Sequence, residues 1–412
     1  MPARPPARTH ARRLLLGGLA LLVPSALLTW PVPGAAGDEA QETPPHVSVR
    51  VVGGQKIRLE ALPQVVQFGG KVADPDHAAA AVVATIRPVR VGRRVQLQAR
   101  TGEVWETVAT RRQDGRGRAE FAAAAAVDGK AATYRVKAMA FGGLRARTGT
   151  PVSTARWLEP TWTDEFSGGE LGRAWSTRGR EHGHGNRRTC SKGDPRAVSV
   201  DGGAVRLSVV KDPDATTRCR IKGRDATGGR FAYRLSGHIG TQGEFSFRYG
   251  VAAARVKFHR LRGQHGAFWL QPSGGMYPGA LGSEIDVVEY FGDHHPQGGL
   301  ATFMHRYDGR RRVSTGGWVS NSASYLRSRR DGWSRNYHVF SVEWTPRLLV
   351  FRIDGRETGR MTRGISAERQ FPILSLIAAD YEVPKIKEKH LPQHMYVDWV
   401  RVWETGTDLP QD

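Results

Sequence analysis

Residues 282–292 read GSEIDVVEYFG and carry three acids, Glu284, Asp286 and Glu289, within a strand-like apolar run. Successive side chains of a β-strand point to opposite faces, so Glu284 and Asp286 share one face while Glu289 points to the other. One β-bulge between Asp286 and Glu289 restores the parity, and all three carboxyl groups then face the same side, opposite Ile285. The segment therefore predicts a bulged strand that forms the floor of a cleft.

Three carboxyl groups this close cannot all ionise cheaply, so their pKa values should be driven apart. One protonated and one ionised carboxyl group, about 5–5.5 Å apart, are what retaining glycoside hydrolysis requires. The alternative is an acidic edge strand in solvent. Aromatic residues around the segment favour a sugar-binding cleft over that alternative, because aromatic faces suit sugar rings. They are Trp269, Tyr277, Tyr290, Phe291, Trp318, Trp333 and Trp344.

The segments on both sides of this strand also have β patterns. They include RAVSVDGGAVRLSVV (196–210), FSFRYGVAAARVKF (245–258), GAFWLQP (266–272), YHVFSVEWTP (337–346), FPILSLIAAD (371–380) and MYVDWVRVW (395–403). Helical periodicity is scarce and strands do not alternate with helices. Residues 157–406 therefore predict one large antiparallel β-sandwich or barrel, followed by a tail at 407–412.

A second, smaller β domain is predicted at residues 46–156. Seven or so short alternating runs, from VSVRVV (47–52) to TYRVKAMA (133–140), are separated by Gly, Asp and Pro clusters. This pattern suits an immunoglobulin-like or fibronectin-like β-sandwich. The domain contains no paired carboxylates and no metal-ligand spacing, so we expect an accessory role as a spacer or attachment module.

The first residues are typical of a targeting segment. Four arginines within residues 4–13 precede the apolar run LLLGGLALLVPSALLTW (14–30), and small residues follow at 34–36. We expect a signal peptide at 1–36 and a linker at 37–45, which together predict a secreted protein with no stable membrane span after cleavage. Pro24 disfavours the alternative of a membrane anchor. Export could follow the general or the twin-arginine route.

The charge and the cysteines limit the choice of partners and compartment. The formal net charge is +22, which attracts anionic surfaces and polymers. The arginines are scattered and no nucleic-acid motif accompanies them, so we expect no nucleic-acid partner; an anionic cell wall or a sulfated substrate is the better candidate. Cys190 and Cys219 are the only cysteines. They could form one disulfide or remain two free thiols.

EIDVVE resembles the bulged E-x-D-x-x-E signature of glycoside hydrolase family 16, which includes laminarinases, other β-glucanases, agarases and carrageenases. The likeness covers most of residues 157–404, from WTDEFSGGELGRAWS through SGHIGTQGEFSFRYG to MYVDWVRVW, with the segments in the family's order. It implies a concanavalin-like jelly roll of two curved antiparallel sheets with an open cleft. It also implies that Glu284 is the nucleophile, Glu289 the acid/base, and Asp286 the residue that tunes the nucleophile.

The same resemblance suggests further site residues. Trp269, His305 and Asn186 match family positions near the substrate, and Tyr290 is an aromatic candidate for sugar binding. A structural calcium site is implied on the side away from the cleft, with ligands from Glu165, the Gly203 carbonyl and Asp398; no cofactor is needed for the chemistry. Some positions depart from the family pattern near the expected cleft walls. These are Arg187, Arg188, Cys190, His238 and Ala253.

The combined expectation is a secreted, monomeric, endo-acting retaining hydrolase of a β-linked polysaccharide, with β-1,3-glucan favoured by the resemblance. Two enzymatic alternatives stay open: hydrolysis of an anionic or sulfated galactan, and transglycosylation of a cell-wall glycan. A third alternative is a noncatalytic glycan-binding or adhesion protein on the same sandwich.

Overall fold

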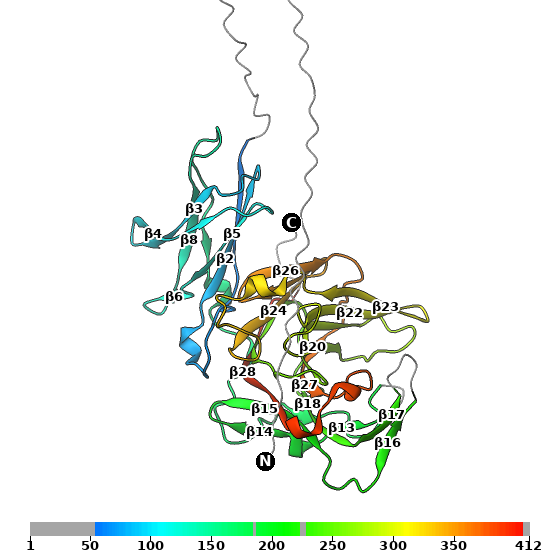
Figure 1. Cartoon of the computed structure of the whole chain (residues 1–412). Helices are drawn as coiled ribbons and strands as arrows, with labels where there is room; N and C mark the ends of the chain where they lie inside the picture. Colours follow the sequence, from blue (N-terminus) through cyan, green and yellow to red (C-terminus); the bar gives the residue numbers. More distant parts are fainter. Residues whose placement is uncertain (1–53, 184–186, 223–227, 407–412) are drawn as a thin grey trace, which may run out of the picture. The chain divides into compact units, whose positions relative to one another are not determined.

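The alternating and apolar strand patterns produce an all-β fold (Figure 1). The computed structural model describes residues 54–183, 187–222 and 228–406, and these contain 28 strands and six short 3₁₀ helices. No helix in these ranges is both long and apolar enough to span a bilayer. The predicted signal peptide, the linker and the tail lie outside the described residues.

The N-terminal strands form two sheets. In chain order the strands are β1 (Lys56–Ala61), β2 (Ala80–Arg87), β3 (Arg94–Thr101), β4 (Val104–Arg112), β5 (Arg118–Ala123), β6 (Ala126–Val127), β7 (Lys130–Ala131), β8 (Thr133–Ala138), β9 (Arg147–Thr148) and β10 (Val152–Ser153). One sheet has the order β1-β2-β5, and the other has the order β10-β8-β3-β4, with β9 also paired to β8; β6 and β7 form a separate two-stranded hairpin. Apolar residues of both sheets, such as Val82, Phe121, Leu97 and Val136, share one core. The immunoglobulin-like assignment and the domain boundaries stay predictions.

A much larger sheet follows. Its first strands are β11 (Trp162–Asp164), β12 (Ser176–Thr177), β13 (Ser191–Gly193), β14 (Val198–Asp201), β15 (Ala204–Lys211), β18 (Arg234–Gly240), β19 (Gly250–Lys257) and β20 (His265–Pro272). The others are β21 (Ser283–Tyr290), β22 (Leu300–Asp308), β23 (Arg311–Trp318), β24 (His338–Trp344), β25 (Leu349–Ile353), β26 (Arg356–Met361), β27 (Gln370–Ile377) and β28 (Gln393–Glu404).

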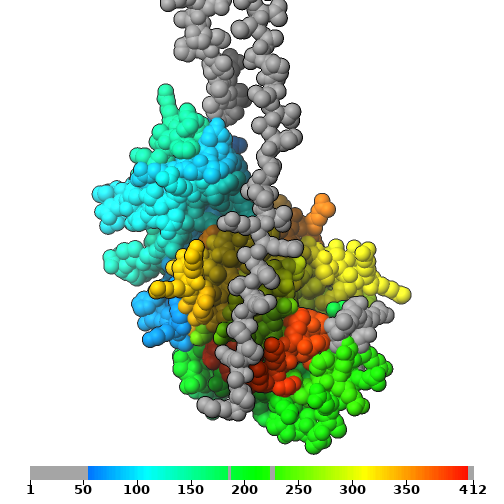
Figure 2. Space-filling view, viewed as in Figure 1, coloured from blue at the N-terminus to red at the C-terminus, as the bar shows by residue number. Residues whose placement is uncertain are grey.

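The main strand order is β23-β22-β21-β20-β27-β18-β15-β28-β19-β24-β25-β26, and the sheet curves so that its two halves enclose one core. Ile285 and Val288 of β21 pack in this core with Phe340 and Val342 of β24. The predicted jelly-roll architecture is therefore confirmed. The β22–β23 hairpin ends the sheet and projects from it at the right of Figures 1 and 2.

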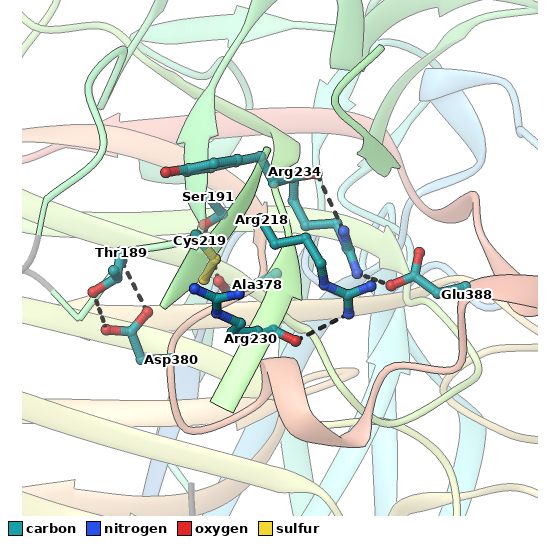
Figure 3. The surroundings of a disulfide bond; sticks show 11 residues. Thr189, Ser191, Arg218, Cys219, Arg230, Arg234, Ala378, Asp380 and Glu388 are labelled. Atoms are coloured by element: carbon teal, nitrogen blue, oxygen red, sulfur yellow. Dashed lines mark hydrogen bonds and ion pairs between the residues drawn. A yellow bond between two sulfur atoms is a disulfide. The ribbon is translucent and has the colours of Figure 1, made fainter. Parts of the chain in front are cut away.

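The short 3₁₀ helices and one small hairpin lie between these strands. The helices are η1 (Pro75–His77), η2 (Ala155–Trp157), η3 (Pro195–Ala197), η4 (Ser322–Tyr325), η5 (Val383–Lys385) and η6 (Glu388–His390). The hairpin pairs β16 (Arg218–Ile221) with β17 (Gly229–Ala232). A disulfide joins Cys219 of this hairpin to Cys190, with Cα atoms 5.6 Å apart (Figure 3). Of the two alternatives that the sequence left open, the structure therefore selects the disulfide.

Arg255 of β19 joins the large sheet to the segment that follows β1. Its side chain is 0% exposed and forms an ion pair with Asp398. It also donates to the carbonyl of Gln67 at 2.7 Å and to that of Lys71 at 3.1 Å. The Trp399 indole donates to the Gln67 side chain at 2.6 Å. Because a buried guanidinium needs several acceptors, the N-terminal segment completes the environment of a residue of the large sheet.

We expected Ala253 near a cleft wall. The structure places it instead in the contact with the N-terminal segment. It is fully buried, and it belongs to an apolar cluster with Val65, Val66, Trp399 and Trp403. The alternation of β19 explains the difference, because Ala252 and Ala254 belong to the core of the large sheet, so Ala253 faces the opposite side.

Candidate active site

The three acids lie together on β21, and the predicted bulge is present. Asp286 pairs with Phe303 of β22 and Glu289 pairs with Ala301, so two residues of β21 oppose one residue of β22 between these pairs. The register with β20 shifts at the same point, because Val288 pairs with Phe268 and Asp286 with Trp269. The extra residue on β21 allows acids at an odd spacing to face the same side.

Cross-strand neighbours share a face of the sheet, so the register also identifies the other residues of the floor. They are His305 opposite Glu284, Phe303 and Trp269 opposite Asp286, and Ala267 and Ala301 opposite Glu289. Trp269 and His305 were expected near the acids, and the structure places both there. The short side chains of Ala267 and Ala301 leave Glu289 flanked by little bulk.

Glu289 is an acid held in its protonated form. Burial, reinforced by the charge of Asp286, raises the pKa of Glu289 to about 8. The nearest basic group is His265, whose Nε2 lies 3.6 Å from Oε1 of Glu289. That imidazole does not supply a positive charge near neutral pH, because burial lowers the pKa of His265 to about 3. Glu289 can therefore store a proton at neutral pH.

Asp286 contacts His305 rather than solvent. Its Oδ2 lies 3.1 Å from Nε2 of His305, and Nδ1 of His305 lies 2.7 Å from Oγ of Ser314. Burial, together with the charge of Glu284, raises the pKa of Asp286 well above its ordinary value, and burial lowers the pKa of His305. The His305 imidazole therefore bridges the Asp286 carboxyl group and the Ser314 hydroxyl. This chain orients Asp286 between the two glutamates.

Glu284 accepts polar contacts that suit a carboxylate. Gln271 Nε2 donates to Oε2 of Glu284 at 3.3 Å, and Arg312 of β23 lies 3.5 Å from Oε1. The Gln271 amide is in turn held by Arg178, which donates to its oxygen at 2.8 Å. Glu284, Asp286 and His305 also offer ligand atoms within 4.8 Å of one another, a spacing that a metal ion could use.

Two sequence predictions of substrate contacts have different outcomes. Tyr290 is only 1% exposed, packs against Phe258, and donates its hydroxyl to Asp293. The predicted sugar-binding role of Tyr290 is therefore wrong, because the bulge that turns Glu289 to the face of the other two acids leaves its neighbour in the core. Asn186 lies outside the described residues.

The sequence did not single out several residues that contact the acids or His305. Gln271, His265, Arg312 and Ser314 come from β20 and β23, up to 30 positions from Glu284. The alternation of GAFWLQP contained a signal for Gln271, because Trp269 and Gln271 share a face of the strand. The contacts of Arg312 and Ser314 depend on the β22–β23 register, which no local pattern specifies.

The residues suggested for calcium do not fit that ion. Asp398 is paired with the buried Arg255, and the Glu165 carboxylate accepts from Arg401 at 2.7 and 2.9 Å. Gly203 lies in the turn between β14 and β15. Calcium requires oxygen ligands with spare negative charge. Here two guanidinium groups already neutralise the two carboxylates and would repel a cation.

Comparisons with known proteins agree with this geometry. The family model described as glycosyl hydrolases family 16 matches residues 189–401. A keratan-sulfate endo-1,4-beta-galactosidase of Sphingobacterium multivorum is 27% identical over 272 residues, which cover 62% of this chain and 57% of that protein. A glucan endo-1,3-beta-glucosidase of Cryptopygus antarcticus is 27% identical over 208 residues, which cover 47% of this chain and 65% of that protein.

Among solved structures, the laminarinase catalytic domain from Thermotoga maritima MSB8 aligns with a TM-score of 0.47 and 19% identity, covering 60% of this chain and 98% of that domain. The chain covers less than two thirds of the length of both curated relatives. The family model, in contrast, matches more than half of the chain and includes the whole bulged strand. The protein therefore belongs to glycosyl hydrolases family 16.

Proposed function

We propose that the protein is an endo-acting hydrolase that cleaves a β-linked polysaccharide with retention of configuration. The observation that carries this proposal is the division of roles on β21. Glu289 is held protonated by burial, whereas Glu284 accepts contacts from Gln271 and Arg312. One acid and one carboxylate on the same face of one strand are the two groups that retaining hydrolysis needs.

In the first step, Glu284 attacks the anomeric carbon while Glu289 gives its proton to the glycosidic oxygen. The bond to the leaving sugar breaks, and a glycosyl ester on Glu284 remains. In the second step, Glu289, now ionised, takes a proton from a water molecule whose oxygen attacks the anomeric carbon. Glu284 leaves as a carboxylate, and Glu289 is again protonated. Asp286, held by His305, lies beside the charge that appears and disappears on Glu284.

The stereochemistry of the first product tests this mechanism. We expect proton NMR to show the β-anomer of the new reducing end before mutarotation, and chromatography to show a ladder of oligosaccharides. Laminarin, lichenan, agarose and carrageenan form the test panel. An initial α-anomer would contradict retention, and release of monosaccharide alone would contradict endo action. Products longer than the starting oligosaccharide would identify the transglycosylase alternative.

Two substrate classes remain candidates. β-1,3-Glucan is supported by the sequence resemblance and by the glucanase named among the relatives. An anionic galactan is supported by the relative named for keratan sulfate and by the guanidinium groups near Glu284. The two classes differ in charge, so the charge of the cleft bears on the choice. We further propose that the protein is secreted and acts as a monomer, with an anionic cell-wall surface as an additional partner.

The proton on Glu289 predicts the alkaline limit of activity. Because the acid must be protonated and its pKa is raised to about 8, kcat/KM should hold through neutral pH. It should then fall about tenfold per pH unit above that value. Asp286, Glu284 and His305 are the titratable groups that influence this proton. A pH profile of kcat/KM measures this alkaline fall. If raising the pH had already abolished activity at pH 6, the role of Glu289 as the acid would be contradicted.

A further inference from the structure

Two arginines lie close enough to Glu284 to interact with its charge, and neither has a part in the chemistry described above. Arg178 follows β12, contacts Gln271, and places its guanidinium over the Phe371 ring at 4.9 Å. Arg188 lies 3.2 Å from Nδ1 of His238 through its Nη1 atom. Both side chains are half-buried.

Among the described residues, neither guanidinium forms an ion pair with a carboxylate; their polar contacts are to the neutral side chains of glutamines and His238. Burial is the main cause that lowers the pKa of Arg178 and of Arg188, and the charge of Arg188 lowers that of Arg178 further. The fold therefore holds two like charges close together with partial loss of water, which costs free energy unless an anion compensates.

The backbone around Arg188 is fixed on both sides. The Arg187 carbonyl accepts from the Asp380 amide at 2.7 Å, and Arg187 has a positive φ of 54°. Thr189 donates its amide and its hydroxyl to the Asp380 carboxylate at 2.8 and 2.7 Å (Figure 3). Cys190 is tied by the disulfide. Because binding then needs little reordering of this segment, the guanidinium is pre-organised for a ligand.

The charges of the surrounding groups do not cancel those of the arginines. Arg178, Arg188 and Arg312 all lie close enough to Glu284 for a direct contact or an electrostatic effect. Glu289 and Asp286 have raised pKa values, and His238 and His265 have lowered ones, so each of these four groups carries less charge than its ordinary pKa would give. Even with Glu284 ionised, the three guanidinium groups leave a net positive charge around it.

We infer that Arg188, with Arg178 beside it, forms a subsite for an acidic substituent of the sugar chain, a sulfate ester or a carboxylate, next to Glu284. This inference rests on the proposed function, because it takes the β21 floor as the place where the sugar binds. A guanidinium presents a planar fork of donors that matches both sulfate and carboxylate oxygens. A neutral glucan would add no counter-charge to that of Glu284 for the two guanidinium groups, so the subsite favours the anionic class of substrate over β-1,3-glucan.

The test measures binding to the full chain carrying Glu284→Gln, so that turnover does not interfere. Calorimetry at about 0.15 M salt, where distant charges are screened, compares two matched pairs of oligosaccharides. One pair is carrageenan and desulfated carrageenan, and the other is C6-carboxylated laminarin and laminarin. We expect at least one charged member to bind about tenfold or more tightly than its neutral partner. The pair that shows this preference distinguishes sulfate from carboxylate.

Adding Arg188→Gln should reduce that preference by about tenfold, and Arg188→Lys should restore part of it. The control is Arg111→Gln, an exposed arginine of β4 that removes the same charge outside the cleft; it should leave the preference unchanged. Equal affinities within both pairs, or a preference that survives Arg188→Gln, would overturn the subsite.

Turnover by the unmodified chain separates this inference from the proposed function. Hydrolysis of laminarin with no preference for charge keeps the proposed hydrolase and overturns the anionic subsite. Charge-selective binding that depends on Arg188, with no hydrolysis of any of the four glycans, keeps the subsite and counts against the proposed hydrolysis.

Discussion

Replacing Glu284 by glutamine should lower kcat by about 10⁴-fold or more, and replacing Glu289 by glutamine should lower it by about 10²–10⁴-fold. The first change removes the nucleophile, because an amide oxygen cannot form the glycosyl ester and leave again as a carboxylate. The second removes the proton donor. Steady-state kinetics on the preferred polysaccharide measure both losses.

Stability should change little in either variant. Glutamine has the shape of a protonated glutamate, and Glu289 is already neutral at pH 7 because its pKa is raised to about 8. At position 284, the amide oxygen can still accept from Gln271. Thermal unfolding would verify this, with Glu106→Gln on the exposed face of β4 as the control for loss of a carboxylate elsewhere.

A substrate with an activated aryl leaving group distinguishes the two roles. Such a leaving group departs without protonation, so the first step should survive in Glu289→Gln but not in Glu284→Gln. Added azide then attacks the ester in Glu289→Gln without a general base, and the product is a β-glycosyl azide. If azide rescued Glu284→Gln instead of Glu289→Gln, the roles of nucleophile and acid/base would be reversed. Full activity of both variants would show that neither glutamate has its assigned role.

The second large effect is expected on stability, from Arg255→Met. This change should lower the free energy of unfolding by about 3–5 kcal/mol, because it leaves the Asp398 carboxylate buried without its partner. The carbonyls of Gln67 and Lys71 also lose their donor. Denaturant unfolding followed by tryptophan fluorescence is a suitable measurement, since Trp399 lies in the same contact.

A second substitution identifies the cause of this loss. Removing the unpaired charge as well, in Arg255→Met with Asp398→Asn, should recover part of the stability, because the cost of an isolated buried carboxylate disappears. Arg111→Met on exposed β4 serves as the control and should change stability by less than about 0.5 kcal/mol. If Arg255→Met behaved like Arg111→Met, neither the buried ion pair nor the hydrogen bonds from Arg255 to the N-terminal segment would contribute to stability.

Local rules were sufficient for the central strand. The parity of side chains along a strand required a bulge between Asp286 and Glu289, and the register of β21 with both neighbours shows it. Trp269 and His305 followed from the family resemblance. The prediction for Tyr290 was wrong. Its position next to Glu289 suggested access to sugar, but the alternation of side chains along the strand turns it into the core.

The amino-acid sequence by itself determined the all-β architecture, the family and the three acids, because these depend on side-chain period, strand order and a short motif. Only the tertiary structure decided which groups surround those acids and which charges are paired. Asp398 is 143 positions from its partner Arg255, and Thr189 is 191 positions from Asp380. The physical reason is that burial and Coulomb interactions act between segments that only the folded chain brings together. The protonation of Glu289, the mismatch with calcium and the positive charge beside Glu284 all arise in this way.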